Sequence, residues 1–223
     1  MTERQLHITL NTYWHAGTGQ GASSHLDTRC ARDPDDLPLL PGRQLKGLLR
    51  QAMHLASVWG WLDDVPCPPG PAADLEALLF GSADQEDTRH GTLPGCLIVG
   101  SAGLPAPERA YLAQPGQQAL GATLFDSLHQ TAINERGSAK RYSLRGMEVC
   151  LPVTLTARLQ LDITSVAPDH RAQQQALPSP VAWEVLQRIL PLLQSLGAGR
   201  SRGLGEIGEI TLSPVTGDDH ETA

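Results

Sequence analysis

The sequence predicts an α+β fold, organised as one ferredoxin-like core with insertions and a β-hairpin. Two stretches, after residue 42 and after residue 178, have apolar residues at helical spacing, whereas residues 153–163 alternate strictly between apolar and polar. In chain order the expected elements run strand, helix, strand, hairpin, strand, helix, strand. We therefore expect one domain over residues 1–212, with an insertion at 59–92, a hairpin at 131–147 and a flexible tail at 213–223.

The first half of the chain is expected to supply two strands and the first helix. Apolar and polar residues alternate over 5–13, which is typical of a half-buried strand. Residues 43–57 carry apolar side chains at i, i+3, i+4 and i+7, which predicts an amphipathic helix. The insertion at 59–92 is rich in proline and acidic residues around a short helix candidate at 74–82, and a further strand is expected at 96–99.

The second half is expected to supply the hairpin, two strands and the second helix. Residues 131–145 are polar with a plausible central turn, and they lead into the alternating strand at 153–163. A polar linker is expected at 167–180. The second helix then begins with Ser179 as its N-cap and a proline at the first helical position, and a strand over 206–212 closes the core.

The composition indicates a cytoplasmic protein but does not by itself indicate a nucleic-acid partner. The four cysteines are far apart and form no C-x-x-C pair, which favours reduced thiols over zinc binding. The start lacks the pattern of a signal peptide, and no run of apolar residues is long enough to cross a membrane. The net charge is −7, but basic residues cluster at 29–50, at 136–145 and at 200–202. Charge alone favours scattered solvated side chains, so any basic surface must be argued from motifs.

The stretch GAGRSRGLGEIGEI at 197–210 contains a literal G-x-G-x-x-G. A dinucleotide site requires a strand, a glycine turn and then a helix, whereas here the helix precedes the glycines and a strand follows them. A helix cap and a bulge would explain one or two glycines, but not five among twelve residues with two arginines between them. We therefore expect a backbone cradle for phosphate, formed by Gly197, Gly199, Arg200, Arg202, Gly203 and Gly205.

Several segments together resemble the RAMP (repeat-associated mysterious protein) superfamily of CRISPR effector proteins. PGRQLKGLLR at 41–50 resembles the start of its first helix, and GAGRSRGLGEI at 197–207 resembles its glycine-rich loop. TAINERGSAKRYSLRGMEVCLP at 131–152 resembles its thumb hairpin, with Asn134 where the motif usually has Asp. LLFGSADQEDTRHGTLPGCLIV and LDTRCARDPDDLPLLPG resemble further family segments in the same order. The resemblance is strongest to the backbone subunits of type III effector complexes.

This resemblance implies an RNA-recognition-motif-like core and a role in antiviral ribonucleoproteins. The partners implied are a guide RNA (crRNA), a complementary target RNA and other effector subunits, further backbone subunits among them, with no membrane partner. Sequence-independent binding of RNA needs contacts to phosphate and 2′-hydroxyl groups. The candidates for these contacts, besides the glycine loop, are Arg43, Lys46 and Arg50 on the first helix and Arg136, Lys140, Arg141 and Arg145 on the hairpin, with Tyr142 and Met147 as candidate wedges against a base.

Cleavage of target RNA is the possible enzymatic activity that the resemblance implies. Asp27 matches the position of the family's catalytic aspartate, where it would hold Mg²⁺ or another divalent metal. One carboxylate is a poor metal site, so RNA oxygens or the acidic residues at 33–36 would have to complete it. Without the resemblance, Asp27 is more simply a turn residue. The alternatives are a structural RNA-binding subunit without catalysis and an endoribonuclease that matures guide RNA through His15.

Overall fold

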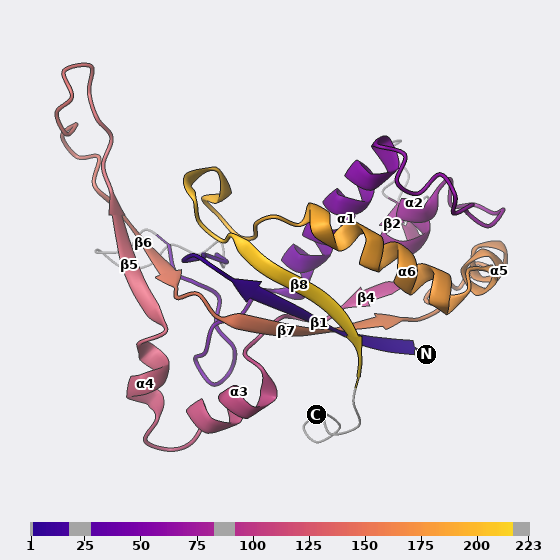
Figure 1. The fold of residues 1–223 in the computed structure, drawn as a ribbon, viewed down its shortest axis with the longest axis horizontal. Coiled ribbons are helices and arrows are strands. Elements are labelled where there is room, and N and C mark those ends of the chain that lie inside the picture. The colour runs from indigo at the N-terminus through magenta and orange to yellow at the C-terminus, as the bar shows by residue number, and fades with distance from the viewer. Residues whose placement is uncertain (1, 18–27, 83–91, 216–223) are drawn as a thin grey trace.

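The computed structural model describes residues 2–17, 28–82 and 92–215. Its centre is a four-stranded antiparallel sheet in the order β4-β7-β1-β8 (Figure 1). These strands are β1 (Thr2–Leu10), β4 (Leu97–Val99), β7 (Thr154–Leu161) and β8 (Ile207–Pro214). No helix in the described parts of the chain is long and apolar enough to cross a membrane.

Two helices complete the core and lie on one face of the sheet, as Figure 1 shows. They are α1 (Gly42–Val58) and α6 (Ser179–Ile189). The core elements therefore follow one another as β1-α1-β4-β7-α6-β8, which is the β-α-β-β-α-β order of a ferredoxin-like fold. The predicted α+β class is confirmed.

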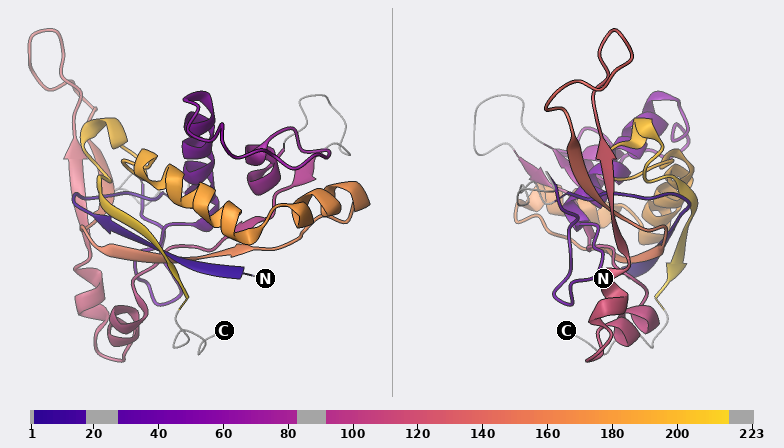
Figure 2. Two further views of the ribbon diagram at one scale, coloured as in Figure 1. Left: turned by 45° about the vertical axis from the view of Figure 1, so that its right-hand side comes forward. Right: turned by 90° about the vertical axis from the view of Figure 1, so that its left-hand side faces the viewer.

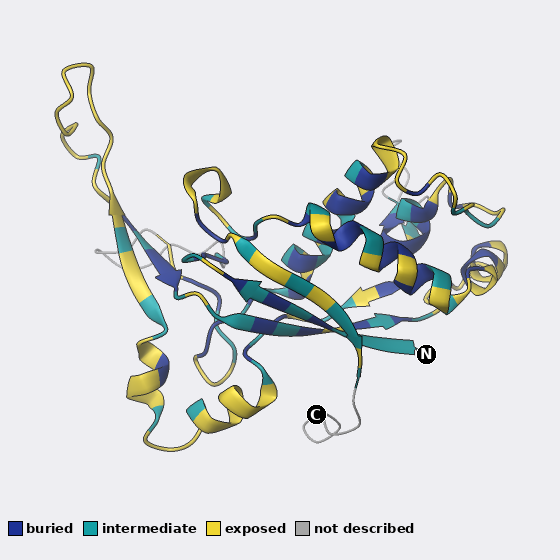
Figure 3. Ribbon diagram, in the orientation of Figure 1, coloured by how far each residue is buried: buried dark blue, intermediate teal, exposed yellow. Residues whose placement is uncertain are grey.

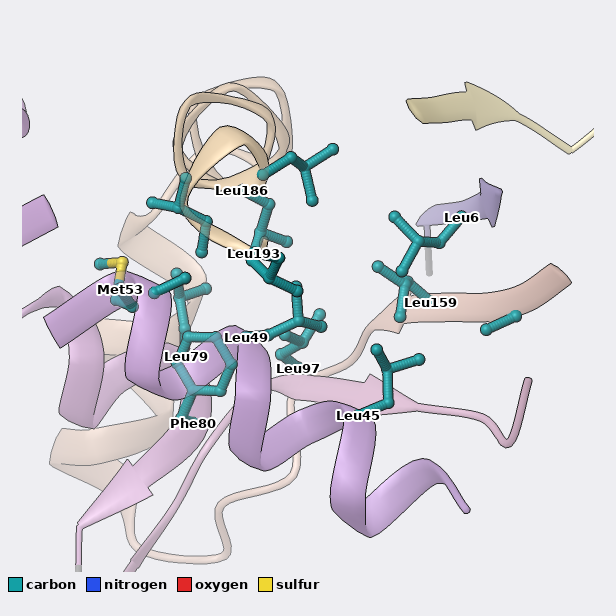
Figure 4. Close-up of a cluster of buried hydrophobic side chains, with 14 of the residues drawn as sticks. Leu6, Leu45, Leu49, Met53, Leu79, Phe80, Leu97, Leu159, Leu186 and Leu193 are labelled. Atoms are coloured by element: carbon teal, nitrogen blue, oxygen red, sulfur yellow. The ribbon is translucent and has the colours of Figure 1, made fainter. Parts of the chain in front are cut away.

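The hydrophobic core lies between this sheet face and the two helices (Figure 4). Leu6 and Ile8 alternate with polar residues along β1, and both are fully buried. Their register partners on β7 are Ala157 and Leu155, and Leu159 follows on the same side of that strand. Helix α1 meets them with Leu45, Leu49 and Met53, and α6 with Val185, Leu186 and Ile189. Apolar side chains that repeat every two residues along the strands and about every 3.6 residues along the helices therefore pack into one core.

The second helix differs from the sequence prediction at its start. Ser179 is the first residue of α6, and Pro178 occupies the N-cap position without a capping side chain. The expected linker is also wrong, because residues 168–176 form helix α5 (Pro168–Ala176). Its buried residues are His170, Gln173 and Gln174, which bond to backbone atoms of 68–72 and 94. A helix that buries polar side chains has no apolar period from which it could be predicted.

The insertions contain short elements around the core. The acidic insertion holds α2 (Leu75–Phe80) and β2 (Gly81–Ser82), and β2 pairs with β3 (Leu93–Pro94). Between β4 and the hairpin lie two more short helices, α3 (Ala106–Leu112) and α4 (Gln118–Ala122). Two short 3₁₀ turns, η1 (Leu190–Leu192) and η2 (Arg200–Arg202), lie between α6 and β8. Strand β8 reaches Pro214, two residues into the segment expected to be a tail.

The hairpin consists of β5 (Phe125–Gln130) and β6 (Arg145–Cys150), so its strands begin before and end after residues 131–147. Its tip extends away from the rest of the molecule in both views of Figure 2. Residues 128–145 are mostly exposed, whereas Glu148, Val149 and Cys150 at the base are buried (Figure 3). The hairpin is thus an exposed arm on a buried base.

Candidate nucleic-acid interface

Residues 13–17, which begin shortly after the end of β1 at Leu10, form the centre of the candidate interface. The glycine loop, the start of α1 and the base of the hairpin all bond to this segment. The bonds are Gly205 N to Tyr13 O (2.7 Å), Ala198 N to His15 O (2.8 Å), Gln44 Nε2 to Gly17 O (3.0 Å) and Cys150 N to Trp14 O (2.7 Å). Three segments far apart in the sequence, which the motifs predict to act together, therefore meet at one place.

Four glycines of the loop have left-handed backbone angles, with φ of 77° at Gly197, 74° at Gly199, 80° at Gly203 and 70° at Gly205. This conformation favours glycine. A Cβ at Gly197 would collide with the His15 carbonyl, and a Cβ at Gly205 with the carbonyl of Leu196. These two glycines therefore allow the loop to pack against its own protein. Gly203 faces open space and is the position where a ligand could approach the backbone.

The two arginines of the loop have different surroundings. Both lie in η2 and are exposed. Arg202 donates a 2.8 Å hydrogen bond to Oε1 of Gln130, the last residue of β5, and so joins the loop to the hairpin. Arg200 forms no hydrogen bond or ion pair with the residues that the structure describes. Its guanidinium is available to an external anion.

The three basic residues of α1 also separate. Arg43 is exposed in the first turn and has no polar partner within the described ranges. Lys46 donates a 2.8 Å hydrogen bond to the carbonyl oxygen of Leu97, and burial lowers the pKa of its amine. Arg50 forms a 2.8 Å ion pair with Glu76 of α2. Lys46 and Arg50 thus make contacts within the fold. Arg43 instead lies in the first turn of α1, next to Gln44, which bonds to Gly17.

The hairpin presents basic side chains that make no polar contact with other described residues. They are Arg136, Lys140, Arg141 and Arg145, and all are exposed. Asn134 orders the tip, because its Oδ1 accepts hydrogen bonds of 3.0 Å from the amides of Arg136 and Ser138. Asparagine therefore supports this turn as an aspartate would. Tyr142 is fully exposed with φ of 60°, whereas Met147 is half-buried in β6.

His15 does not reach the exposed surface. It is 3% exposed, and its Nδ1 lies 2.6 Å from the Glu148 carbonyl oxygen and 3.4 Å from the Cys30 sulfur. These contacts raise the pKa of His15, chiefly through the hydrogen bond with Cys30. A general acid–base must contact the group that it protonates or deprotonates. The predicted role of His15 in guide-RNA maturation is therefore not supported by its position.

Glu148 is a central residue of this region that the sequence reasoning missed. One carboxylate oxygen accepts a 2.8 Å hydrogen bond from the Cys30 amide, and the other forms a 2.8 Å ion pair with Arg32. The Arg32 guanidinium also lies 3.6 Å from the ring centroid of Phe125 at the start of β5. The only available signal was an acidic residue inside an apolar strand. Glu148 holds residues 30–32 against the hairpin base.

Asp27 lies outside the described residues, as do the acidic residues at 84–87. Thr28 pairs with Met147, and its carbonyl oxygen accepts a 3.1 Å hydrogen bond from the Glu148 amide. The carboxylates proposed to complete a metal site with Asp27 are already paired. Asp33 and Asp35 bind Arg109, and Asp36 binds Arg32. Over the described ranges, which do not include Asp27, no three His, Cys, Asp or Glu side chains gather to hold a metal ion.

The open face of the sheet offers little to RNA bases. Its side chains include Gln5, His7, Thr9, Thr156 and Arg158, which alternate with the buried residues of β1 and β7. RNA-recognition motifs stack bases on aromatic rings of their sheet. No Phe, Tyr or Trp occupies the described strands β1, β4, β7 and β8. Loops and the hairpin are therefore the better candidates for RNA contact.

A family profile described as the RAMP superfamily matches residues 7–207. The chain belongs to the RAMP superfamily. Two solved chains from type III-B Cmr-beta complexes are similar in fold, one from the apo state and one from the complex bound to cognate target RNA. Each aligns with a TM-score of 0.60 at 12% identity, over 95% of this chain and 97% of the other. No curated protein matches the sequence.

Proposed function

We propose that this protein is a subunit of a type III CRISPR effector complex that binds guide RNA and positions target RNA. The observation that carries this proposal is the convergence of the glycine loop, the start of α1 and the hairpin base on residues 13–17. The similarity in fold to chains of Cmr-beta complexes supports the same assignment. Further subunits of the complex, including copies of this chain, would be its protein partners.

The guide would bind first through its phosphates. Arg200 and Arg43 are exposed cations without partners among the described residues, and the open space at Gly203 lets an external group approach the loop backbone. Lysine and arginine contacts to phosphate need no base sequence. The net charge of −7 does not oppose this, because local clusters, not the total, determine the potential at a binding surface.

The hairpin would contact the guide–target duplex. Its four basic side chains, which make no polar contact within the described ranges, can follow a phosphate backbone, and Tyr142 presents a fully exposed ring that can stack on a base. Met147 is half-buried near the base, so Tyr142 is the better candidate for a wedge.

Cleavage of target RNA through Asp27 with Mg²⁺ stays a prediction, as does the cytoplasmic location. A complex assembled with guide RNA tests both the RNA-binding role and the catalytic role. Retention of guide RNA by the wild-type complex, and its salt-sensitive loss with Arg43→Ala and Arg200→Ala together, is expected for the RNA-binding role. Regular cutting of target RNA that disappears with Asp27→Ala would add the catalytic role. A complex that binds but does not cut supports the structural subunit, and one that retains no RNA contradicts the proposal.

A further inference from the structure

An exposed aromatic pair lies at the end of helix α1. Trp59, the C-cap residue, is 57% exposed, Trp61 is 43% exposed, and Val58 before them is 67% exposed. The centroids of the two indole rings lie 6.0 Å apart and the rings are tilted by 56°, which is a favourable aromatic contact. The other tryptophans, Trp14 and Trp183, are buried. Large apolar side chains that gather on a surface in this way mark an interaction site.

A carboxylate lies directly beside this pair. Gly60, between the two tryptophans, has a φ of 72°, and a Cβ built there would lie 2.9 Å from Oδ2 of Asp63. Asp63 is exposed, and its carboxylate has no polar partner among the described residues. Aromatic rings attract a cation to their faces, and a carboxylate accepts hydrogen bonds from its N–H groups. The three side chains therefore offer the chemistry that binds an organic cation.

The surroundings of the pair carry an excess of negative charge. Asp64 and Glu184 share one cation, because both bind Arg188 at 2.7 Å. Asp63 adds a carboxylate without a cation of its own. Helix α1 has 17 residues, so this acidic end lies about 25 Å from Arg43 in the first turn, and away from the hairpin (Figure 1). The site is thus separate from the candidate RNA interface.

We propose that Trp59, Trp61 and Asp63 form a docking site for an arginine side chain on a different protein subunit of the effector complex. The guanidinium would lie against the indole rings and donate hydrogen bonds to the Asp63 carboxylate, and apolar side chains around it would cover Val58. Arginine suits this site better than lysine, because its planar guanidinium stacks on aromatic rings and is more weakly hydrated. Tryptophan and arginine are enriched among the residues that carry most of the binding energy of protein interfaces.

The charge of the site argues against RNA and against a second copy of this chain. An acidic surface repels phosphates. The exposed cations without described partners lie mostly in the glycine loop, the start of α1 and the hairpin, which the proposed function assigns to RNA. A second copy that holds guide RNA therefore has few arginines left for this site. The choice of a different subunit rests on the proposed function, whereas the cation-binding chemistry does not.

Oxidation by hydroxyl radicals, mapped by mass spectrometry, tests the site in the assembled complex. We expect Trp59 and Trp61 to be oxidised several-fold more slowly in the complex than in the isolated chain. Trp59→Ala together with Trp61→Ala should weaken incorporation into the complex about tenfold or more. Tyr111→Ala is the matched control, because Tyr111 is an exposed aromatic residue on α3, and it should leave incorporation unchanged.

A second measurement uses the isolated chain, so that the site is tested even when no complex assembles. A hexa-arginine peptide is added, and the oxidation of Trp59 and Trp61 is followed against peptide concentration. We expect the peptide to slow their oxidation, with an affinity that Asp63→Asn lowers more than Asp64→Asn does. Both variants remove one charge, but Asp64 already binds Arg188. Thermal unfolding of each variant checks that it folds.

Three results would overturn the proposal. One is equal oxidation of the two tryptophans in the complex and in the isolated chain. Another is protection that guide RNA alone, or self-association of the chain, already produces. The third is a peptide that leaves the oxidation unchanged, or whose affinity Asp63→Asn and Asp64→Asn lower equally. Loss of guide RNA from the complex contradicts the proposed function and not this site, because the peptide measurement requires neither RNA nor other subunits.

Discussion

Arg202 in the glycine loop donates a 2.8 Å hydrogen bond to Gln130 at the end of β5. The loop follows α6 near the C-terminus, whereas Gln130 belongs to the hairpin, so this bond joins the two segments that would contact RNA on either side of residues 13–17. Arg200, two residues earlier, has no polar partner among the described residues. Arg202 thus joins the loop to the hairpin, whereas the Arg200 guanidinium is available to bind a phosphate.

Arg200→Ala should weaken guide-RNA binding more than Arg202→Ala, because Arg202 bonds to Gln130 whereas Arg200 has no polar partner among the described residues. Loss of one phosphate contact should reduce the slope of log affinity against log salt by about one. Affinity measured over a salt series checks this. Arg188→Ala is a control of equal charge change, since Arg188 pairs with Asp64 and Glu184 away from the interface. Equal slopes for Arg200→Ala and Arg188→Ala would contradict the assignment.

Arg202→Ala should instead alter the coupling between loop and hairpin. A double-mutant cycle with Gln130→Ala isolates the pair, and we expect a coupling of less than about 1 kcal/mol because both side chains are exposed. Amide exchange at residues 126–130 should increase in either single variant and no further in the double variant. Additive effects on exchange would show that the hydrogen bond does not connect the two segments.

The glycines of the loop should differ sharply in their tolerance of alanine. Gly203→Ala should cost about 1–2 kcal/mol of unfolding free energy, because its φ of 80° is unfavourable but its surroundings are open. Gly205→Ala should cost more than about 3 kcal/mol, since its Cβ would collide with the backbone of Leu196. Chemical denaturation of both variants gives the comparison. Similar losses in the two would indicate that the loop does not pack as described.

Glu148→Ala should detach residues 30–32 from the hairpin base. It removes the acceptor of the Cys30 amide and the partner of Arg32 together, and we expect a loss of about 2–4 kcal/mol in unfolding free energy. Glu148→Gln is the matched control, because it keeps an amide oxygen for the Cys30 amide and loses only the charge. It should retain part of the stability, and a loss as large as that of Glu148→Ala would assign the whole effect to the ion pair with Arg32.

The Cys30 thiol should ionise at unusually low pH. Hydrogen bonds from Cys150 and His15 lower its pKa from 9.0 to about 6 in the folded protein. Its contribution to stability is therefore full above pH 9.0 and is lost as the pH falls through about 6. The raised pKa of His15 acts in the opposite direction: its contribution is full below pH 6.5 and is lost as the pH rises through the folded value. The other charged groups at the site are Glu148 and Arg32.

Thiolate absorbance in a pH titration measures this ionisation directly. The folded wild type should show a step near pH 6 that Cys30→Ser removes, and the unfolded protein should show only steps near pH 9.0. Because the thiol pair and His15 titrate together, the step belongs to the cluster as a whole. A folded protein without any step below pH 8 would contradict the described contacts.

The core could be predicted from the sequence because its elements bury apolar side chains at regular spacing. The alternation over 153–163 became β7, and the helical period after residue 42 became α1. Helix α5 could not be predicted, since its buried residues are polar and are stabilised by hydrogen bonds to backbone far away in the sequence. A periodic pattern in the sequence shows which residues are apolar, and so it misses a helix such as α5 whose buried residues are polar.

The candidate site was only partly predictable for a related reason. Glycines at 197, 199, 203 and 205 indicate positive φ, but only the fold shows that Gly197 and Gly205 pack against the protein itself. Lys46 and Arg50 match a motif as well as Arg43 does, yet their partners Leu97 and Glu76 lie on other elements. Which cations stay free depends on tertiary neighbours that spacing along the chain does not reveal.

The central claim is that guide RNA passes along the glycine loop and the start of α1. Photo-crosslinking of an assembled complex that carries 4-thiouridine guide RNA, followed by peptide mapping, tests it most directly. We predict crosslinked peptides from residues 197–205 and from the first turn of α1, with hairpin peptides added when target RNA is present. Crosslinks confined to the open sheet face or to α5, with none in these segments, would contradict the account.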